Sequence, residues 1–530
     1  MSESETVASN AGTEDVGGSH EGHNRQMRVT FNLWSTLGLV YSITATPIGI
    51  GSYLTFSLVL GGAPFYIYGY IFAVSLNIIL CVALAEIASI YPHPSGKLLH
   101  ALGSQRLLIG DERTDTGYVG HIYWVGKLAP EKWVSFLSYW TGILTSAAWF
   151  FWNAGTYLLT AQILLAMVMQ LYPDSYSTYP AWHALLVAYA QALIAVLWNV
   201  PFFKSWPYIL KFMVVLTNVG VVFLAISLLV RTSPKQSAHT VFVDVVNTSG
   251  WPSAGVVFFL GLLPGTTAIN GFDSASHMVE EMPDPARQVP QVMVGNALLS
   301  GGLGLPMVII FCFCISNPEN LLAPLGGVTI IQLFKDSYNS DALFVLAGLL
   351  YVVVTIIAAT AVTTTTSRVW WSFAQHHGLP FHSWLSKIQT TSLYAVPVNA
   401  IIASTVLSCL VLLIQLGPSY VLAALFSTAN ICFYLSYAIV LVCFLHRKWT
   451  QGLPPHYFDL KGLLGSVLGV VSIIWSVFAT VWLTFPYYLP VTAQWMNWSV
   501  ALLAITIVLF SVDWTLRARK TYIIPSPLVI

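Results

Sequence analysis

Twelve separate stretches of about 20 mainly apolar residues run through this chain of 530 residues. A stretch of that length crosses a bilayer as one α-helix, because a helix satisfies its own backbone hydrogen bonds. Only 8% of the residues are charged, whereas soluble domains have about 25%. We therefore expect an all-α integral membrane protein with twelve transmembrane helices, over residues 34–60, 65–91, 134–165, 181–200, 207–230, 251–281, 292–316, 342–373, 396–416, 420–445, 464–485 and 497–516.

Charge balance and cysteine spacing exclude several classes of protein. The 21 basic and 21 acidic residues give no net charge, so the sequence lacks the basic surface that nucleic-acid-binding proteins need. The six cysteines lie in apolar runs without CxxC or Cys/His spacing, which indicates buried thiols and not a metal centre. We find no phosphate loop or nucleophile–base pair. The sequence predicts a protein that is not an enzyme and that has no metal, cofactor or nucleic-acid partner.

The distribution of positive charges predicts the orientation in the membrane. If the N-terminus is cytosolic, only Arg231, Lys235 and Lys335 of the 21 Lys and Arg residues lie outside, as the positive-inside rule requires. Asn-x-Ser/Thr triplets begin at Asn247 and Asn497, at predicted outer faces, and Asn247 is the glycosylation candidate. We expect both termini in the cytosol, in the plasma membrane or alternatively the vacuolar membrane.

The chain divides into one membrane domain and two polar tails. Residues 1–33 are polar and lack the apolar core of a signal peptide, which predicts a disordered cytosolic tail. Residues 34–516 form the expected membrane domain, and 517–530 form a cytosolic C-terminal tail. A polar insert over 97–119 follows the second span. It is either a genuine cytosolic loop or an intron retained in the gene model, because its Gly-Lys junction can encode a splice donor.

Two of the predicted spans contain helix-breaking residues near their middle. The first has the sequence TATPIGIGS over residues 44–52, and the sixth has LPGTTAINGFD over 263–273. These residues could simply kink ordinary helices. However, the two interruptions lie five spans apart, and paired interrupted helices are typical of transporters built from inverted repeats. We expect discontinuous helices 1 and 6, repeats over about 34–230 and 251–445, and peripheral spans over 464–516.

Interrupted helices expose backbone amides and carbonyls that can bind a solute. Asp273 follows the second interruption directly, where its carboxylate could attract an amine or a quaternary ammonium, or could simply cap a helix. Thr363 offers a hydroxyl from the eighth span, although threonines often bond to their own helix. The predicted substrate-binding residues are Thr46, Gly49, Gly51, Thr267, Asn270, Gly271, Phe272, Asp273 and Thr363.

Four motifs link the chain to a known group of proteins. They are AEIASIYPHPSG over 85–96, GFDSASHMVEEMP over 271–283, SRVWWSFAQHHGLP over 367–380 and PVTAQWMN over 490–497. Together they resemble motifs of the amino acid–polyamine–choline permease superfamily, most closely its fungal amino acid, GABA and choline permeases. Two departures occur. The family's SGGQxYW is split by the insert, and Gln375-His376 replace the usual Arg-Asp, so the salt bridge of that loop is not expected.

This resemblance implies a LeuT-like fold of five plus five helices, with the last two spans peripheral. It also implies a permease that imports an amino acid, GABA or choline by alternating access with H⁺ as a coupled ion. The partners would then be the small solute, the proton and the lipid bilayer. A non-transporting nutrient sensor of the same fold is the alternative, although such proteins usually have longer tails.

Acidic residues inside a membrane are costly and are therefore candidates for function. Glu86 is predicted either to carry a coupled proton or to cap backbone amides of the loop after the first span. Glu280 and Glu281, which the resemblance marks as structural or gating residues, follow His277 at i+3 and i+4. No further ligand accompanies these three, so we predict no metal site there.

Overall fold

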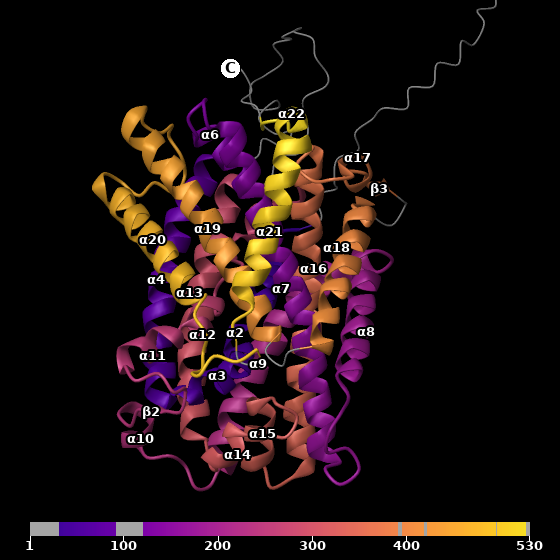
Figure 1. Ribbon diagram of the computed structural model, residues 1–530, viewed down its shortest axis with the longest axis vertical. Helices are drawn as coiled ribbons and strands as arrows, with labels where there is room; N and C mark the ends of the chain where they lie inside the picture. Colours follow the sequence, from indigo (N-terminus) through magenta and orange to yellow (C-terminus); the bar gives the residue numbers. More distant parts are fainter. Residues whose placement is uncertain (1–30, 92–119, 391–394, 418–420, 494–495, 526–530) are drawn as a thin grey trace, which may run out of the picture.

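The computed structural model describes residues 31–91, 120–390, 395–417, 421–493 and 496–525, which form a bundle of long helices (Figure 1). Twelve spans in this described part are long and apolar enough to cross a membrane, which confirms the predicted fold class. An even number of crossings places the start of the first span and the end of the last span at the same end of the bundle. The last span, drawn in yellow, ends at the top of Figure 1. We call this the terminal end. The N-terminal tail before residue 31 and the insert over 97–119 lie outside the described residues.

Ten spans are built mainly on one regular helix each. These helices are α4 Gly62–Ile90, α7 Val134–Leu171, α8 Ala181–Asn199, α9 Trp206–Arg231, α13 Pro285–Phe313, α16 Asp341–Gln375, α18 Val398–Val411, α19 Val421–Thr450, α20 Leu463–Trp482 and α21 Ser499–Asp513. Shorter pieces extend or connect them: η2 Phe203–Ser205, α6 His121–Leu128, α10 Ala238–Phe242, η4 Val279–Glu281, α14 Pro318–Leu322, α15 Thr329–Ser337, α17 His382–Leu385, η5 Leu412–Leu416, η6 Trp514–Ala518 and α22 Arg519–Thr521.

Strands contribute little to this fold. Within the described part, β1 Leu60–Gly61 pairs antiparallel with β2 Val246–Asn247, and β3 Gln389–Thr390 pairs with β4 Ala395–Val396. The first pair joins the end of span 1 to the loop after α9, far from the terminal end (Figure 1).

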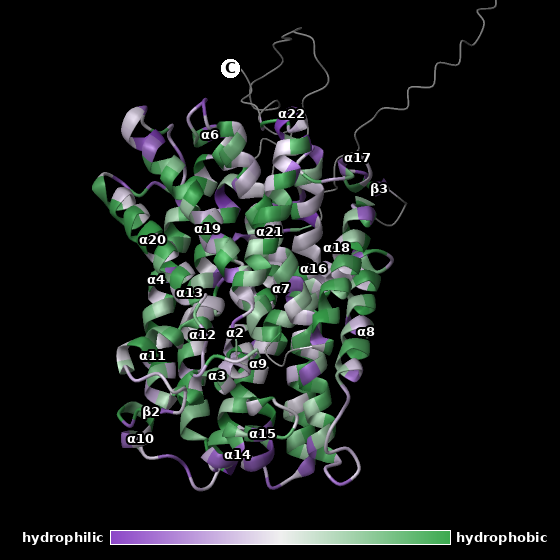
Figure 2. Cartoon of the chain, viewed as in Figure 1, coloured by the Kyte–Doolittle hydropathy of each residue, from purple (hydrophilic) through white to green (hydrophobic). Residues whose placement is uncertain are grey.

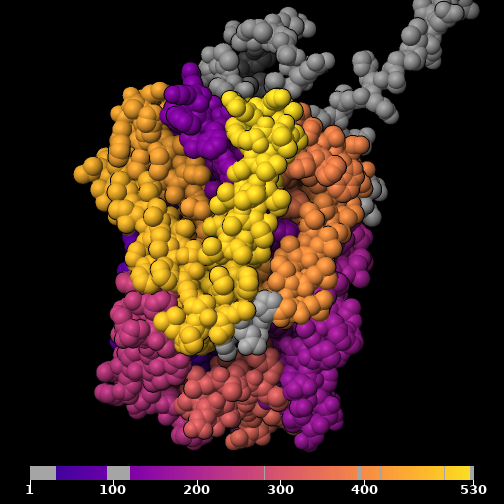
Figure 3. All heavy atoms as spheres, viewed as in Figure 1, coloured from indigo at the N-terminus to yellow at the C-terminus, as the bar shows by residue number. Residues whose placement is uncertain are grey.

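The spans differ in how much of their surface packs against protein. In spans 6 and 10, 78% of the residues in the apolar window are buried, and in spans 1 and 3 the share is 72%. The corresponding share in span 12 is 11%. Lipid must cover what protein does not, and the cartoon in Figure 2 colours most residues of outer helices such as α8, α20 and α21 as hydrophobic. Figure 3 shows α21 and α22 in yellow on the outside of the bundle. Spans 1, 3, 6 and 10 therefore form its centre, and the last span is peripheral.

Span 1 and span 6 are interrupted where the sequence predicts it. Span 1 consists of α1 Leu33–Thr44, α2 Thr46–Gly49, η1 Ile50–Tyr53 and α3 Leu54–Val59. Ala45 separates the first two pieces with a left-handed φ of 41°, which costs a non-glycine residue about 1–2 kcal/mol. Span 6 consists of α11 Ala254–Leu260, α12 Leu263–Thr267 and η3 Phe272–His277, with Gly271 at φ 87° before η3.

Hydrogen bonds from side chains hold the two interruptions in place. The Thr46 hydroxyl donates to the carbonyl of Ala268 and so ties one interruption to the other. On the α4 side, the Asn77 amide donates to the carbonyls of Gly265 and Thr266, at 3.3 and 3.1 Å. Such bonds supply the partners that backbone leaving a helix needs within a membrane.

Candidate functional site

A small cavity of about 50 Å³ lies between the two interruptions. Span 1 contributes Thr44, Ala45, Thr46 and Gly49, and span 6 contributes Thr267 and Ala268. Gly49 is required by close packing, because a Cβ atom there would lie 2.7 Å from the carbonyl oxygen of Thr44. Span 1 also contributes Ile43, Ile50 and Tyr53, and the rest of the wall comes from α7, α16 and α19, with Trp152, Thr156, Leu159, Val354, Thr355, Ala358 and Phe426.

The wall of this cavity contains three aromatic rings and is otherwise built from threonines and small or aliphatic residues. Phe426 lies between Tyr53 and Trp152, with ring centroids 6.2 and 6.1 Å away. No described residue in the lining is Asp, Glu, Lys or Arg. The Thr44 hydroxyl is buried and has no hydrogen-bond partner in the part of the chain that the structure describes. The negative end of the α1 dipole also points toward this region, because α1 ends at Thr44. Aromatic faces and a helix C-terminus both favour a cation.

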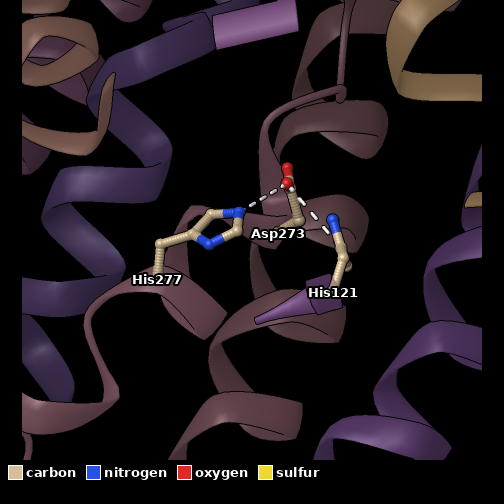
Figure 4. Close-up of side chains that lie close together, drawn as sticks. All are labelled: His121, Asp273 and His277. Atoms are coloured by element: carbon tan, nitrogen blue, oxygen red, sulfur yellow. Dashed lines mark hydrogen bonds and ion pairs between the residues drawn. The ribbon is translucent and has the colours of Figure 1, made fainter. Parts of the chain in front are cut away.

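A second cluster lies beyond the cavity toward the terminal end, where two histidines flank one carboxylate (Figure 4). Nε2 of His277 lies 3.1 Å and Nε2 of His121 lies 3.8 Å from Oδ2 of Asp273. The Tyr437 hydroxyl donates to Oδ1 of the same carboxylate at 3.0 Å. The three side chains are 3% exposed or less. We call His121, Asp273 and His277 the His–Asp–His cluster.

Local backbone geometry explains why these side chains meet. Gly271 turns the chain with its left-handed φ, and η3 then places Asp273 and His277 one turn apart. His121 begins α6 directly after Gly120, whose φ is 66°. A Cβ atom on Gly120 would lie 2.5 Å from the His277 ring, so only glycine allows α6 to approach this closely.

Aromatic rings separate the His–Asp–His cluster from the cavity. The Trp149 ring is 6.3 Å from His277 and 5.2 Å from Phe433, centroid to centroid. On its other side Trp149 stacks at 6.3 Å against Trp152, which lines the cavity. The cluster and the cavity are therefore neighbours with a shared tryptophan wall, and they are not one site.

The third feature is a buried ion pair at the terminal end. Nε of Arg368 on α16 lies 3.1 Å from Oε1 of Glu281, and both side chains are at most 2% exposed. The guanidinium also lies 4.9 Å from the centre of the Phe203 ring. The backbone N–H of Phe31 donates to the Glu281 carbonyl at 3.0 Å. This pair thereby joins the start of span 1, the exit of span 6 and span 8.

Glu86 takes part in a separate contact that joins span 2 to the end of span 10 and to the loop that follows it. Its Oε1 lies 3.3 Å from Nζ of Lys448 and 3.7 Å from Nε2 of His456. The carboxylate is fully buried, while the Lys448 side chain is 16% exposed. Its partners therefore come from the end of α19 and the loop that follows, not from the loop after span 1.

The structure brings some of the sequence-predicted residues to the cavity. Thr46, Gly49 and Thr267 line it. Asp273 belongs to the His–Asp–His cluster, and Thr363 bonds to Tyr157 and Asn153 at 2.7 and 2.9 Å. Their proposed roles remain predictions.

The other predicted residues lie beside the cavity or away from it. Asn270 donates to Oδ1 of Asn430 at 2.5 Å, Phe272 stacks on Tyr437 at 5.6 Å, and Gly271 packs on Trp149. Gly51 faces Ile330 and Phe311.

Glu280 lies in η4, and its side chain is outside the described part. Asn247 is exposed in β2, whereas Asn497, the other Asn-x-Ser/Thr residue, is 5% exposed.

The sequence analysis did not select Tyr53 and Trp152 of the cavity or His121 of the His–Asp–His cluster. Tyr53 and Trp152 could not be selected among 25 tyrosines and 19 tryptophans, because most membrane aromatics serve as packing or interface anchors. His121 follows Gly120 in GHIYW over residues 120–124, which is the second half of the split motif. Its partner Asp273 is far away in the sequence, so only folding reveals the contact.

The environment of His121, which lies outside the membrane-spanning segments, predicts an acid-sensitive stability. Burial lowers the pKa of His121 from 6.5 to about 3, although Asp273 opposes this shift. Below pH 6.5 the unfolded chain binds a proton at this residue, whereas the His121 ring of the native state stays neutral. The free energy of unfolding therefore decreases as the pH falls from about 6.5 to about 3. The loss from pH 7.5 to 5.5 should be about 1–2 kcal/mol.

Thermal unfolding of purified wild type and His121→Gln at pH 7.5 and 5.5 would measure this effect. We expect the variant to lose less stability on acidification than the wild type. His239→Gln, at a histidine whose side chain is 70% exposed, is the matched control and should behave as the wild type. Equal acid sensitivity in all three proteins would contradict the prediction.

Comparison with known proteins gives a consistent result. Residues 31–510 match the family model described as amino acid permease. The chain is 26% identical to a choline transporter of Saccharomyces cerevisiae, over 94% of this chain and 83% of that protein. It is 27% identical to a putative amino acid/polyamine transporter of Macrophomina phaseolina, over 88% and 97%. It is 25% identical to a swainsonine transporter of Arthroderma benhamiae, over 94% and 92%.

Proposed function

This chain belongs to the amino acid permease family, and on that premise we propose that it imports choline by alternating access coupled to protons. At the coarser level it is a multi-pass membrane transporter of small solutes and not an enzyme, since its family and relatives are permeases and transporters. The finer proposal rests on one observation: the cavity between the interrupted helices is lined by three aromatic rings and by no charged side chain among the described residues.

Choline combines a quaternary ammonium with one hydroxyl, and the cavity offers a partner for each. The faces of Tyr53, Trp152 and Phe426 suit a methylated cation, which cannot donate N–H hydrogen bonds. The buried Thr44 hydroxyl has no hydrogen-bond partner among the described residues and could bond to the choline hydroxyl. One relative is named a choline transporter. These features support choline over solutes that bring a carboxylate as well.

An amino acid or GABA is the second candidate, because the helix interruptions expose backbone groups that can bind a carboxylate. The family description and the relative named for amino acids and polyamines favour it. The cavity of about 50 Å³ must widen for any of these solutes. Widening of this kind is expected when interrupted helices move during alternating access.

The proposed orientation places the release of an imported solute at the terminal end. With the terminal end in the cytosol, most Lys and Arg residues lie on the cytosolic side, as the positive-inside rule requires. The buried pair of Arg368 and Glu281 would then close the cytosolic side of the bundle. Opening this side would release the solute into the cell. We place the protein in the plasma membrane, with the vacuolar membrane as the alternative.

Uptake into yeast that lacks its own permeases tests the proposal. Labelled choline, GABA and a panel of amino acids would be offered at pH 5 and 7.5, with and without a protonophore. We expect saturable choline uptake that acid stimulates and the protonophore abolishes. Uptake of GABA or an amino acid alone would refute choline as the substrate. Absence of all uptake, from protein shown to reach the membrane, would favour the nutrient sensor.

A further inference from the structure

The His–Asp–His cluster is an unusual arrangement for the interior of a membrane protein. Its carboxylate is fully buried, and no lysine or arginine among the described residues forms an ion pair with it. A buried charge without a compensating partner costs several kcal/mol. A cluster of this composition is therefore expected to bind a compensating positive charge or to become exposed to water.

We propose that His277 and Asp273 bind the proton that drives transport, and that His121 positions their carboxylate. This inference rests on the proposed function and identifies the residues that would couple it to H⁺. The contact of 3.1 Å between Nε2 of His277 and Oδ2 of Asp273 is hydrogen-bond geometry, so the two atoms are close enough to share the proposed proton. With both imidazoles neutral the cluster has a charge of −1, and one added proton brings it to zero.

His121 differs from His277 in its contacts. Its Nε2 lies 3.8 Å from Oδ2 of Asp273, which is too long for a hydrogen bond, and has no other partner in the described part. Burial keeps the pKa of this ring low, so it stays neutral and cannot neutralise the carboxylate. His121 thus packs against one side of the Asp273 carboxylate, and His277 is the residue that shares the proton with this carboxylate.

The other titratable groups that the structure describes around the Asp273 carboxylate do not neutralise its charge. Tyr437 on α19 already donates to Oδ1, and Tyr434 on the same helix bonds to Asn77. Cys81 on α4 is a buried, free thiol near the carboxylate. These neighbours are neutral at physiological pH, as are the Trp149 and Phe433 rings that separate the cluster from the cavity.

The position of the cluster connects proton binding to the conformational change. Asp273 lies two residues after Gly271, at the end of the same interruption whose Ala268 lines the cavity. The bond from Thr46 to Ala268 then links this segment to span 1. A neutral cluster favours the buried geometry. Loss of the proton leaves an uncompensated charge there, which favours opening of the terminal end and entry of water.

Purified full-length protein in liposomes allows coupling to be separated from transport. Labelled choline uptake would be measured with pH 5.5 outside and 7.5 inside, and without a gradient. Exchange against unlabelled choline at equal pH would be measured in parallel, because exchange needs no net proton movement. We expect the gradient to stimulate the wild type at least fivefold. In Asp273→Asn and His277→Gln this stimulation should fall below about 1.5-fold while exchange continues.

Ser274→Ala is the matched control, because it changes the same buried turn without removing a titratable group. It should keep the full stimulation. Gradient-driven uptake that survives in either cluster variant would overturn the proposal, as would loss of exchange in both variants when they elute as folded protein. A metal ion bound stoichiometrically to the wild type and absent from Asp273→Asn would also overturn it.

The behaviour of the wild type separates choline transport from its coupling to protons. A wild type that exchanges choline but does not respond to the gradient leaves choline transport intact and overturns the proton site. A wild type that neither exchanges nor accumulates choline contradicts the proposed function itself.

Discussion

Replacing Arg368 by glutamine is expected to destabilise the protein by about 3–5 kcal/mol and to remove most of it from the cell surface. Removal of one partner of a buried ion pair leaves the other charge without compensation. Glu281 would be left as the uncompensated buried charge, because its side chain is only 2% exposed. The variant also loses the contact between the guanidinium and the Phe203 ring, which lie 4.9 Å apart. Thermal unfolding in detergent and the amount of protein at the surface would measure the effect.

An exposed ion pair of the same chain provides the control for this substitution. Lys335 and Asp341 lie 2.9 Å apart, but their side chains are 35% and 78% exposed. Exposed pairs contribute little to stability, so Lys335→Gln should unfold at nearly the wild-type temperature. The double variant Arg368→Glu with Glu281→Arg should recover part of the loss. Equal unfolding temperatures for Arg368→Gln and Lys335→Gln would show that the buried pair does not hold the terminal end.

Replacing Trp152 by alanine is expected to weaken choline transport about tenfold or more in apparent affinity. The substitution removes one of the three rings around the cavity and its contact with Phe426 at 6.1 Å. A desolvated cation–π contact contributes about 2 kcal/mol, and about 1.4 kcal/mol corresponds to tenfold in affinity. Trp152→Phe keeps an aromatic face and should lose much less. Concentration-dependent uptake of labelled choline would measure both variants.

An uncharged analogue separates the cation–π contribution from simple packing. In 3,3-dimethylbutan-1-ol a carbon replaces the nitrogen of choline while the shape remains. Wild-type protein should prefer choline over this competitor, and Trp152→Ala should reduce the preference. Trp182→Ala, at a tryptophan that is 51% exposed, should leave both affinities unchanged. An unchanged preference in Trp152→Ala would remove the aromatic cavity as the basis of choline recognition.

Sequence reasoning located the interruptions better than it located the side chains around them. Proline and glycine act locally, so TATPIGIGS and LPGTTAINGFD predict the breaks at Ala45 and before Gly271 that the structure contains. The role of Asp273 depends on distant residues. The carboxylate turns toward His121 and Tyr437 instead of lining the cavity, and no local pattern contains that information.

The sequence by itself determined the number of spans, their approximate bounds and the two interruptions. These properties depend on length, hydropathy and backbone preferences, which are local and which the bilayer imposes on each segment separately. Only the tertiary structure decided which polar groups meet. The aromatic wall around the cavity, the His–Asp–His cluster and the pair of Arg368 with Glu281 each join segments from distant parts of the chain. Their formation depends on how helices pack against each other, and hydropathy is nearly the same for every alternative packing.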